Sequence, residues 1–475
     1  MRAMKLALVG LLLLSGMEGV ALWAAPPTLP NILLILVEDV GAWELGCYGG
    51  AAAETPNLDQ MAEEGMRFSA AYAASCVGGP SRASAMTGKS PVRLRFTEDL
   101  RGGGVAGALQ PAGSGAGLSG DDVTFAETLR EAGYRTAYVG PWGLGLGAGA
   151  PERHGFEVVS GAAAVPQSFF SPFGLPDLGD SLPGTHLGER LTTEALRFMS
   201  AAKEKPFLLC FSWPTSHRAE DQRSEILEKV KARAGEGAGV DARVVAAAGL
   251  EALDAAVGQM VERLRELDLT KKTIVVFHSA SGRWQSSGAE DEAMRGVVGT
   301  LWEGGLRVPL IVRWPSVLAG GALCRVPVIS TDLYWTFVEL ARGVPPVELE
   351  PDGQSMLPLF KNVGGAPRPF FWHFPHYHES GGRPSSAIRV GDWKLVENFE
   401  DSSAWLVNLI ADPTESTDLS GKWPKRTAAL REQLKAWRDQ SLAAMPSANA
   451  QPPPGPADVG AAAGEVPGGS AAGPR

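Results

Sequence analysis

The chain has 475 residues, with 43 basic against 53 acidic side chains and a formal net charge of −10. This acidic balance excludes a general nucleic-acid binder, which would present a basic surface; it still leaves room for a local basic pocket. Hydrophobic residues make up 44% of the chain and charged residues 20%. We therefore expect one large domain with a sizeable core, plus a smaller domain.

Residues 1–25 are predicted to be a secretory signal peptide. Arg2 and Lys5 precede the apolar run Leu6–Leu14, and small residues follow as far as Ala25. The run is shorter than the about 20 residues of a membrane span. We expect export to the periplasm or outside the cell, with no membrane span after cleavage. The alternative is a signal anchor that is retained on the mature protein.

Residues 26–365 are predicted to form an α/β domain. Short apolar runs read as buried strands at Pro30–Asp39, Lys205–Trp213 and Thr273–Ala280, and Leu250–Leu269 reads as an amphipathic helix. Strands that alternate with helices indicate a central, mostly parallel sheet between helices. Ligands of such sheets bind beyond the carboxyl ends of the strands.

Residues 366–446 are predicted to form a small α+β subdomain, with short antiparallel strands and a closing helix at Arg426–Met445. Residues 447–475 are rich in Pro, Gly and Ala and are predicted to be disordered. The four cysteines match neither a zinc spacing nor a disulfide framework. The sequence carries no signal for an oligomeric state.

Several segments in chain order resemble the sulfatase family. They are Glu38 and Asp39 followed by "ELGCYGG", then "TPNLDQMAEEGMRF", "PSRASAMTG", "HGFE", "KPFLLCFSWPTSH", "TLWEGGLRVPLIVRWP", "GDWKLVE" and "NLIADPTE". The resemblance implies an alkaline-phosphatase-like α/β domain with a small C-terminal domain. It also implies hydrolysis of sulfate esters with a calcium ion and a formylglycine made from Cys or Ser.

The nucleophile position of that family is Gly78 in this chain. The family motif is C-x-P-S-R or S-x-P-S-R, and Pro80, Ser81 and Arg82 fix the register. Glycine has no side chain that could be oxidised to an aldehyde. Cys76 stands two residues too early, which displaces a side chain by roughly 6–7 Å. We expect Cys76 to be an inert thiol; the alternative is a shifted nucleophile.

The family's metal ligands are only half retained. Glu38 and Asp39 fill the first pair of positions, whereas Ala280 and Ser281 stand at the second pair. Calcium takes six to eight oxygen ligands, mostly from carboxylates and carbonyls. We therefore expect no tight calcium binding, and Glu38 and Asp39 to persist as solvated or paired acids.

The remaining family positions are mixed. Pro141 and Gly143 replace a Lys and a His, and Val298 stands where the family often has a second Lys. Arg82 and His217 match retained family positions. Arg82 is expected either to contact an anion or to be a surface or ion-pairing arginine. His217, without its partners, is expected to be a polar strand-end residue that hydrogen-bonds locally.

Three histidines in "WHFPHYH", namely His373, His376 and His378, are candidates for the rim of a substrate pocket. Imidazole also suits zinc, copper or nickel, but a rim inherited from the family is the favoured interpretation.

These substitutions predict an exported pseudo-sulfatase that keeps the fold and a pocket for a sulfated or neutral glycan. The losses fall on the chemical positions, while the scaffold motifs are intact. One alternative is an active sulfuric ester hydrolase with a rebuilt centre that uses Cys76 and His217. The other is a non-catalytic partner of an active paralogue.

Overall fold

The computed structural model describes residues 29–450, except 101, 103–104, 106, 180, 236–237, 285–293, 346–351 and 366. The predicted signal peptide lies outside the described residues, as does the predicted tail from residue 451. The sequence places the start of that tail at residue 447, and here the structure corrects it. Ser447–Ala448 form β17, which pairs with β4 (Leu109–Gln110), because the backbone of this segment finds hydrogen-bond partners in an earlier loop.

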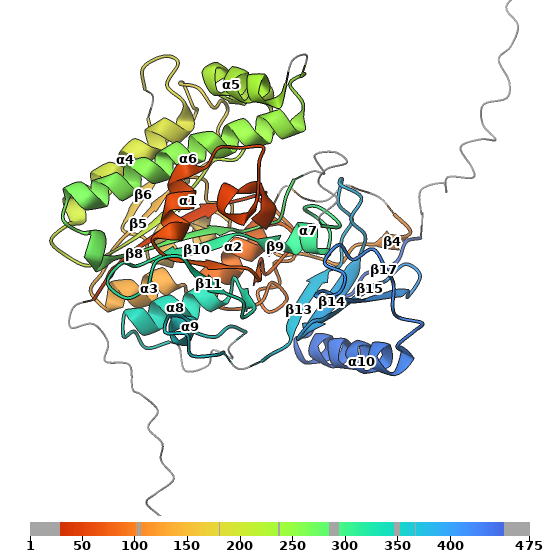
Figure 1. Cartoon of the computed structure of the whole chain (residues 1–475). Helices are drawn as coiled ribbons and strands as arrows, with labels where there is room; N and C mark the ends of the chain where they lie inside the picture. Colours follow the sequence, from red (N-terminus) through yellow and green to blue (C-terminus); the bar gives the residue numbers. More distant parts are fainter. Residues whose placement is uncertain are drawn as a thin grey trace, which may run out of the picture.

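An eight-stranded sheet forms the centre, in the order β11-β2-β10-β8-β1-β7-β5-β6 (Figure 1). Its strands are β1 (Asn31–Val37), β2 (Met66–Phe68), β5 (Arg135–Val139), β6 (Val158–Ser160), β7 (Phe207–Ser212), β8 (Thr273–Ser279), β10 (Leu310–Arg313) and β11 (Ala322–Cys324). Within this sheet β10 runs antiparallel to both neighbours, and the other pairings are parallel. The mostly parallel sheet predicted from the sequence is therefore confirmed.

Strand β1 shows why the chain folds in three layers. All seven of its residues are buried, as expected for a strand that is covered on both faces. Ile32, Leu34 and Leu36 pack into one core, and Leu33 and Ile35 pack into the other. This alternation follows from the two-residue period of a strand.

Helices cover both faces of the sheet. Figure 1 shows α1, α4 and α6 on one side and α3, α8 and α9 on the other. The helices are α1 (Pro56–Glu63), α2 (Gly78–Thr87), α3 (Phe125–Glu131), α4 (Leu187–Ala202), α5 (Ser224–Ala234), α6 (Ala242–Glu266), α7 (Glu303–Leu306), α8 (Asp332–Leu340), α9 (Leu357–Phe360) and α10 (Pro424–Gln440). Short 3-10 turns lie at Ala42–Glu44, Gly46–Tyr48, Gly147–Gly149, Pro151–His154, Ala219–Asp221 and Thr270–Lys272.

Among the described helices, α6 alone is long and apolar enough to cross a membrane by length and composition. Just over half of its most apolar window, 56%, is buried inside the protein. Leu253, Val257 and Met260 of this helix belong to the core between α1, α4 and the sheet. That packing accounts for its apolar composition.

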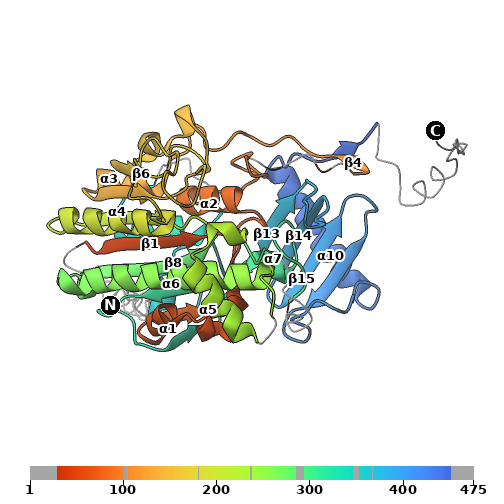
Figure 2. The same ribbon diagram turned by 90° about the horizontal axis from the view of Figure 1, so that it is seen from above.

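The C-terminal part is an antiparallel sheet of β13 (Phe370–Phe374), β14 (Ser385–Val390), β15 (Trp393–Asn398) and β16 (Ala404–Asn408), with α10 on one face. This confirms the predicted small α+β subdomain. Its other face packs on a three-stranded sheet of β3 (Ala71–Tyr72), β9 (Arg307–Val308) and β12 (Val328–Ile329). Figure 2 shows it at the end of the molecule toward which β1 runs.

Candidate functional site

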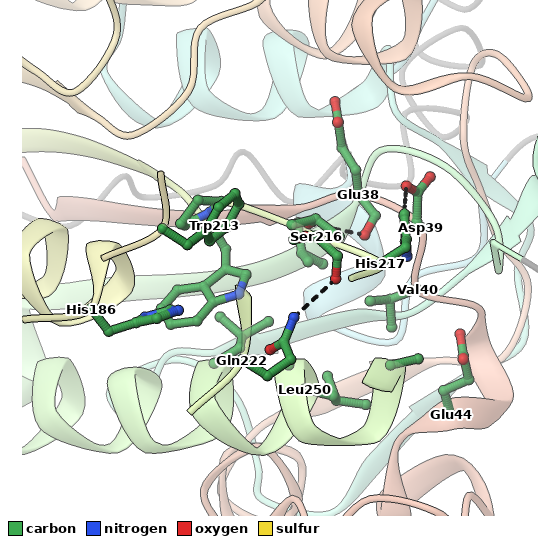
Figure 3. A pocket seen from close by; sticks show the side chains of 17 residues that line it. Glu38, Asp39, Val40, Glu44, His186, Trp213, Ser216, His217, Gln222 and Leu250 are labelled. Carbon is green, nitrogen blue, oxygen red and sulfur yellow. Dashed lines mark hydrogen bonds and ion pairs between the residues drawn. The ribbon is translucent and has the colours of Figure 1, made fainter. Parts of the chain in front are cut away.

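The candidate site lies where three neighbouring parallel strands end. Glu38 and Asp39 follow β1, His217 follows β7, and Ser281 follows β8. Since β1 pairs with β7 on one side and with β8 on the other, their carboxyl ends meet at one edge of the sheet. Figure 3 shows Glu38, Asp39 and His217 at this edge. The structure thus brings these sequence-predicted residues together, and Gly78 opens α2 beside them.

The Glu38 side chain occupies the space of a nucleophile side chain at position 78. A β-carbon added to Gly78 would overlap the Glu38 carboxyl group. The same carboxylate forms an ion pair with Arg82, with Oε1 lying 2.8 Å from Nε. Burial raises the pKa of Glu38 above its ordinary value, and the Arg82 guanidinium opposes this rise. The longer Glu, in place of the family's usual Asp, reaches the position that Gly78 vacates.

The Asp99 carboxyl group, from the segment that follows α2, lies at the first turn of that helix, and this contact was not predicted from the sequence. The Gly79 N–H donates to Asp99 Oδ1 at 2.6 Å. A helix N-terminus is a favourable place for an anion, and here a carboxyl group of the chain itself occupies that place. Burial, together with the nearby Glu38 carboxylate, raises the pKa of Asp99 to about 7. No motif or spacing in the sequence indicates this contact.

Arg82 is held by protein groups on both sides of its guanidinium. It is only 5% exposed. Nη1 donates to the Pro141 carbonyl at 2.8 Å, and Nη2 lies 2.5 Å from where a β-carbon of Gly143 would stand. Gly143 has a φ of +63°, a conformation that favours glycine. The guanidinium therefore fills the space of the family's histidine, and its charge is matched by Glu38.

Hydrogen bonds to both oxygens hold the Asp39 carboxylate. The Ser281 hydroxyl donates to Oδ1 at 2.8 Å, and His217 Nε2 lies 2.8 Å from Oδ2. The Asp39 N–H donates back to Ser281 Oγ at 2.9 Å. Asp39 has a φ of +63°, which is uncommon for a residue with a side chain and is tolerated best by Asn and Asp.

Ala280 and Val298, which replace a metal ligand and a lysine of the family, are both buried. Ala280 is buried, and its N–H donates to the Val37 carbonyl, which extends the pairing of β8 with β1. Val298 lies in the apolar cluster between the two domains. Trp284 stacks on the His217 ring, with centroids 4.1 Å apart and planes 7° apart, and this aromatic cover was also missed from the sequence.

Cys76 lies in the core. It is fully buried, and burial raises the pKa of its thiol well above the ordinary value, as does the nearby Glu98. The thiolate is the nucleophilic form of cysteine, so these surroundings disfavour reaction at sulfur. The placement agrees with the inert thiol expected from the sequence.

The three candidate rim histidines are not equivalent. His373 is buried between Ser386 Oγ at 2.7 Å and the Ala444 carbonyl at 2.8 Å. His376 is also buried and lies 2.8 Å from Thr97 Oγ1. His378 is half-buried and makes an edge contact with Trp284. Burial lowers the pKa of both His373 and His376 to about 4, so both rings are neutral near pH 7. Neither ring offers a positive charge to a ligand at a pocket rim.

Comparison with known proteins identifies the family. A sulfatase family model matches residues 30–344, and a model of the C-terminal region of N-sulphoglucosamine sulphohydrolase matches residues 299–440. The chain belongs to the sulfatase family. It is 32% identical to human arylsulfatase A over 81% of this chain and 77% of that one. It is 30% identical to rat N-acetylgalactosamine-6-sulfatase over 81% of this chain and 74% of that one.

Solved structures agree with this assignment. The crystal structure of Ps i-CgsB superposes with a TM-score of 0.74 at 26% identity, over 86% of this chain and 92% of that one. The PsFucS1 sulfatase from Pseudoalteromonas superposes with a TM-score of 0.67 at 22% identity, over 86% and 89% of the two chains, which speaks to the fold alone. The alkaline-phosphatase-like fold implied by the resemblance is confirmed.

The residues present do not fit the sulfatase cofactors. Formylglycine needs a Cys or Ser at position 78, where the chain has Gly. For calcium, Ala280 offers no side-chain oxygen, and both Asp39 oxygens already accept hydrogen bonds. Within the described parts of the chain, no group of three or more His, Cys, Asp or Glu side chains is arranged to hold a metal ion.

Proposed function

We propose that this protein is an exported sulfatase-family pseudoenzyme, which keeps the fold and a glycan pocket without hydrolysing sulfate esters. The observation that carries the proposal is the Glu38 carboxylate. It occupies the nucleophile's space at Gly78 and pairs with Arg82, the arginine that the family retains beside its nucleophile.

The electrostatics of the centre support the same conclusion. Sulfate ester hydrolysis needs cationic groups or donors aimed at the sulfate oxygens. Here the Gly79 N–H is taken by Asp99, and the guanidinium of Arg82 is taken by Glu38 and Pro141. A carboxylate about 4 Å from a sulfate would repel it by about 4 kcal/mol near a protein surface. The substitutions thus exchange an anion site for internal ion pairs.

An active centre rebuilt around Cys76 gains no support from its burial and raised thiol pKa. Partnership with an active paralogue likewise rests on no feature of the described surface. We therefore retain one proposed function.

Calorimetric titration of the purified mature chain with calcium and with sulfate tests the proposal. We expect heat indistinguishable from dilution for both ions, because their positions are taken by Asp39–Ser281–His217 and by Glu38–Arg82–Asp99 contacts. Saturable binding of both ions would contradict it. Human arylsulfatase A, titrated in the same buffers, is the positive control.

Export has its own test. N-terminal sequencing of the chain recovered from a bacterial periplasm or culture medium should begin between Ala21 and Pro26. A chain that stays in the membrane with Met1 intact would support the retained signal anchor instead.

A further inference from the structure

A contact between the two domains holds the segment that carries Asp99. Thr97, Glu98 and Asp99 follow α2, and His376 follows β13 of the C-terminal subdomain. Thr97 Oγ1 lies 2.8 Å from His376 Nε2, and Glu98 Oε2 lies 3.4 Å from His376 Nδ1. Both nitrogens of one imidazole therefore face the segment Thr97–Asp99.

The Glu98 carboxyl group is buried without a permanent positive charge beside it. Glu98 is 7% exposed and His376 is 3% exposed. Among the described residues, His376 is the basic side chain that lies within ion-pair distance of Glu98. The Asp99 carboxyl and the Cys76 thiol also face Glu98, and His373 lies near His376. None of these groups carries a fixed positive charge.

The Glu98–His376 contact therefore needs one proton. The pair can exist as a carboxylic acid beside a neutral imidazole, or as a carboxylate beside an imidazolium. Loss of the proton leaves a buried carboxylate without a cation, which is costly. Burial and the neighbouring Asp99 raise the pKa of Glu98 to about 8, and burial lowers the pKa of His376 to about 4. These directions favour the neutral form of the pair near pH 7.

The backbone links this pair to other parts of the same interface. The N–H groups of Thr97 and Glu98 both donate to Ser114 Oγ, each at 3.1 Å. The Ala112 N–H donates to the Pro375 carbonyl at 3.3 Å, next to His376 in the chain. Departure of Glu98 from its buried place would therefore disturb the contacts on both sides of it.

Asp99 is the residue through which this interface reaches the degenerate centre. Its Oδ1 accepts the Gly79 N–H at 2.6 Å, in the first turn of α2. Glu38, Asp39 and Arg82 also face its carboxyl group. Since Asp99 follows Glu98 directly, movement of Glu98 would withdraw Asp99 from Gly79 and free the N-terminus of α2.

We propose that the Glu98–His376 contact is a proton-sensitive latch that keeps Asp99 in the first turn of α2 while it holds its proton. Loss of the proton releases the segment Thr97–Asp99 and opens the centre. This inference rests on the proposed function and deepens it, because it assigns a regulation to the same centre.

The direction of the pH dependence follows from the two states of Glu98. In the open state the carboxyl group meets water and has its ordinary pKa of 4.5, against about 8 in the closed state. Between these values opening releases a proton, so the opening constant should rise by about tenfold per pH unit and level off above pH 8. His376 acts in the opposite direction below its ordinary pKa of 6.5, since the open ring gains a proton.

Hydrogen exchange, followed by mass spectrometry on the full mature chain, tests the latch. Exchange rates at pH 6, 7, 8 and 9 are corrected for their intrinsic pH dependence, in peptides that cover residues 76–82 and 107–115. In wild type the protection should fall from pH 6 to pH 8 and then level off. Protection that stays constant over this range would overturn the inference.

Glu98→Gln isolates the titrating group, because the amide keeps the volume of the side chain and cannot ionise. The protection of wild type relative to Glu98→Gln should fall by more than about tenfold between pH 6 and pH 8. A ratio that does not change with pH would contradict the latch. Glu131→Gln, at an exposed position of α3, is the matched control and should follow wild type.

Peptides of α6 distinguish local opening from unfolding of the whole chain. At pH 8 the peptides of the latch should exchange at least about tenfold faster than those of the buried part of α6. Equal protection in both would mean that the segment opens only by global unfolding, and would overturn the inference.

The outcomes separate the latch from the proposed function. Sulfate ester hydrolysis by a chain whose latch opens with rising pH would overturn the proposed function and leave the latch standing. Protection independent of pH in a chain without hydrolysis would overturn the latch alone.

Discussion

At the scale of single residues, neighbouring side chains fill the space of the catalytic side chains that this protein lacks. The Glu38 carboxyl reaches the space beside Gly78, and the Arg82 guanidinium reaches the space beside Gly143. Each exchange replaces a reactive group with a charge that is paired inside the protein. Unpaired charge in such a place would be costly, whereas a matched pair with good geometry is tolerated.

Restoring a cysteine at position 78 should therefore destabilise the protein. In Gly78→Cys the new β-carbon overlaps the Glu38 carboxyl, and the displaced acid strains its ion pair with Arg82. We expect a loss of about 1–3 kcal/mol in the free energy of unfolding, measured by urea denaturation. Gly113→Cys, where a β-carbon meets nothing within 4 Å, is the control and should be close to neutral.

The double variant Glu38→Asp/Gly78→Cys distinguishes this cause from a general effect of the cysteine. Shortening the acid by one methylene frees space at position 78, so part of the lost stability should return. Additive losses in the two single variants would contradict the overlap.

At the scale of elements, the strand ends determine which residues meet. The sequence located β1, β7 and β8 from their apolar runs, and the parallel order placed Asp39, His217 and Ser281 at one edge. It could not locate Asp99 or Trp284, because their contacts come from loops whose course depends on tertiary packing. The burial of His373, within β13, and of His376 was not predicted for the same reason: their partners Ser386 and Thr97 lie on other segments of the chain.

Asp99, at the first turn of α2, should make the free energy of unfolding depend on pH. Its folded-state pKa of about 7 lies above the ordinary value of 3.8, so its contribution to stability is present at low pH and is lost as pH rises toward 7. Asp99→Asn cannot ionise. The stability of this variant relative to wild type should therefore rise between about pH 4 and pH 7.

Urea denaturation of both proteins across that pH range measures the effect. Asp121→Asn, on an exposed loop, is the control and should follow wild type. A stability difference between Asp99→Asn and wild type that stays constant with pH would contradict the raised pKa.

At the scale of the whole molecule, a buried ion cluster joins the two domains. Lys394 of β15 lies 2.9 Å from Glu303 and 3.0 Å from Glu415, and all three side chains are fully buried. Tyr72 donates to Glu303 at 2.7 Å. Burial raises the pKa of Glu415 to about 7, against the opposing effect of Lys394. The sequence indicated two domains, but this connection between them has no sequence signal.

Removing the positive charge of Lys394 should lower the free energy of unfolding. Lys394→Met removes the cation that the two buried carboxylates share and leaves Glu303 with Arg307 at 3.6 Å, which should cost about 3–5 kcal/mol of the free energy of unfolding. Lys435→Met breaks a surface pair with Asp439 and should cost no more than about 1 kcal/mol. If the two variants lost equal stability in denaturant titrations, the cluster would not hold the domains together. Adding Glu303→Gln and Glu415→Gln to Lys394→Met should restore part of the loss.

We propose that a sulfatase fold persists here without sulfatase turnover. The rate of aryl sulfate hydrolysis by the purified mature chain, co-expressed with a formylglycine-generating enzyme, tests it most directly. We expect the rate of the buffer blank, with human arylsulfatase A active in the same assay. Hydrolysis above the blank that purifies with the chain would contradict the claim.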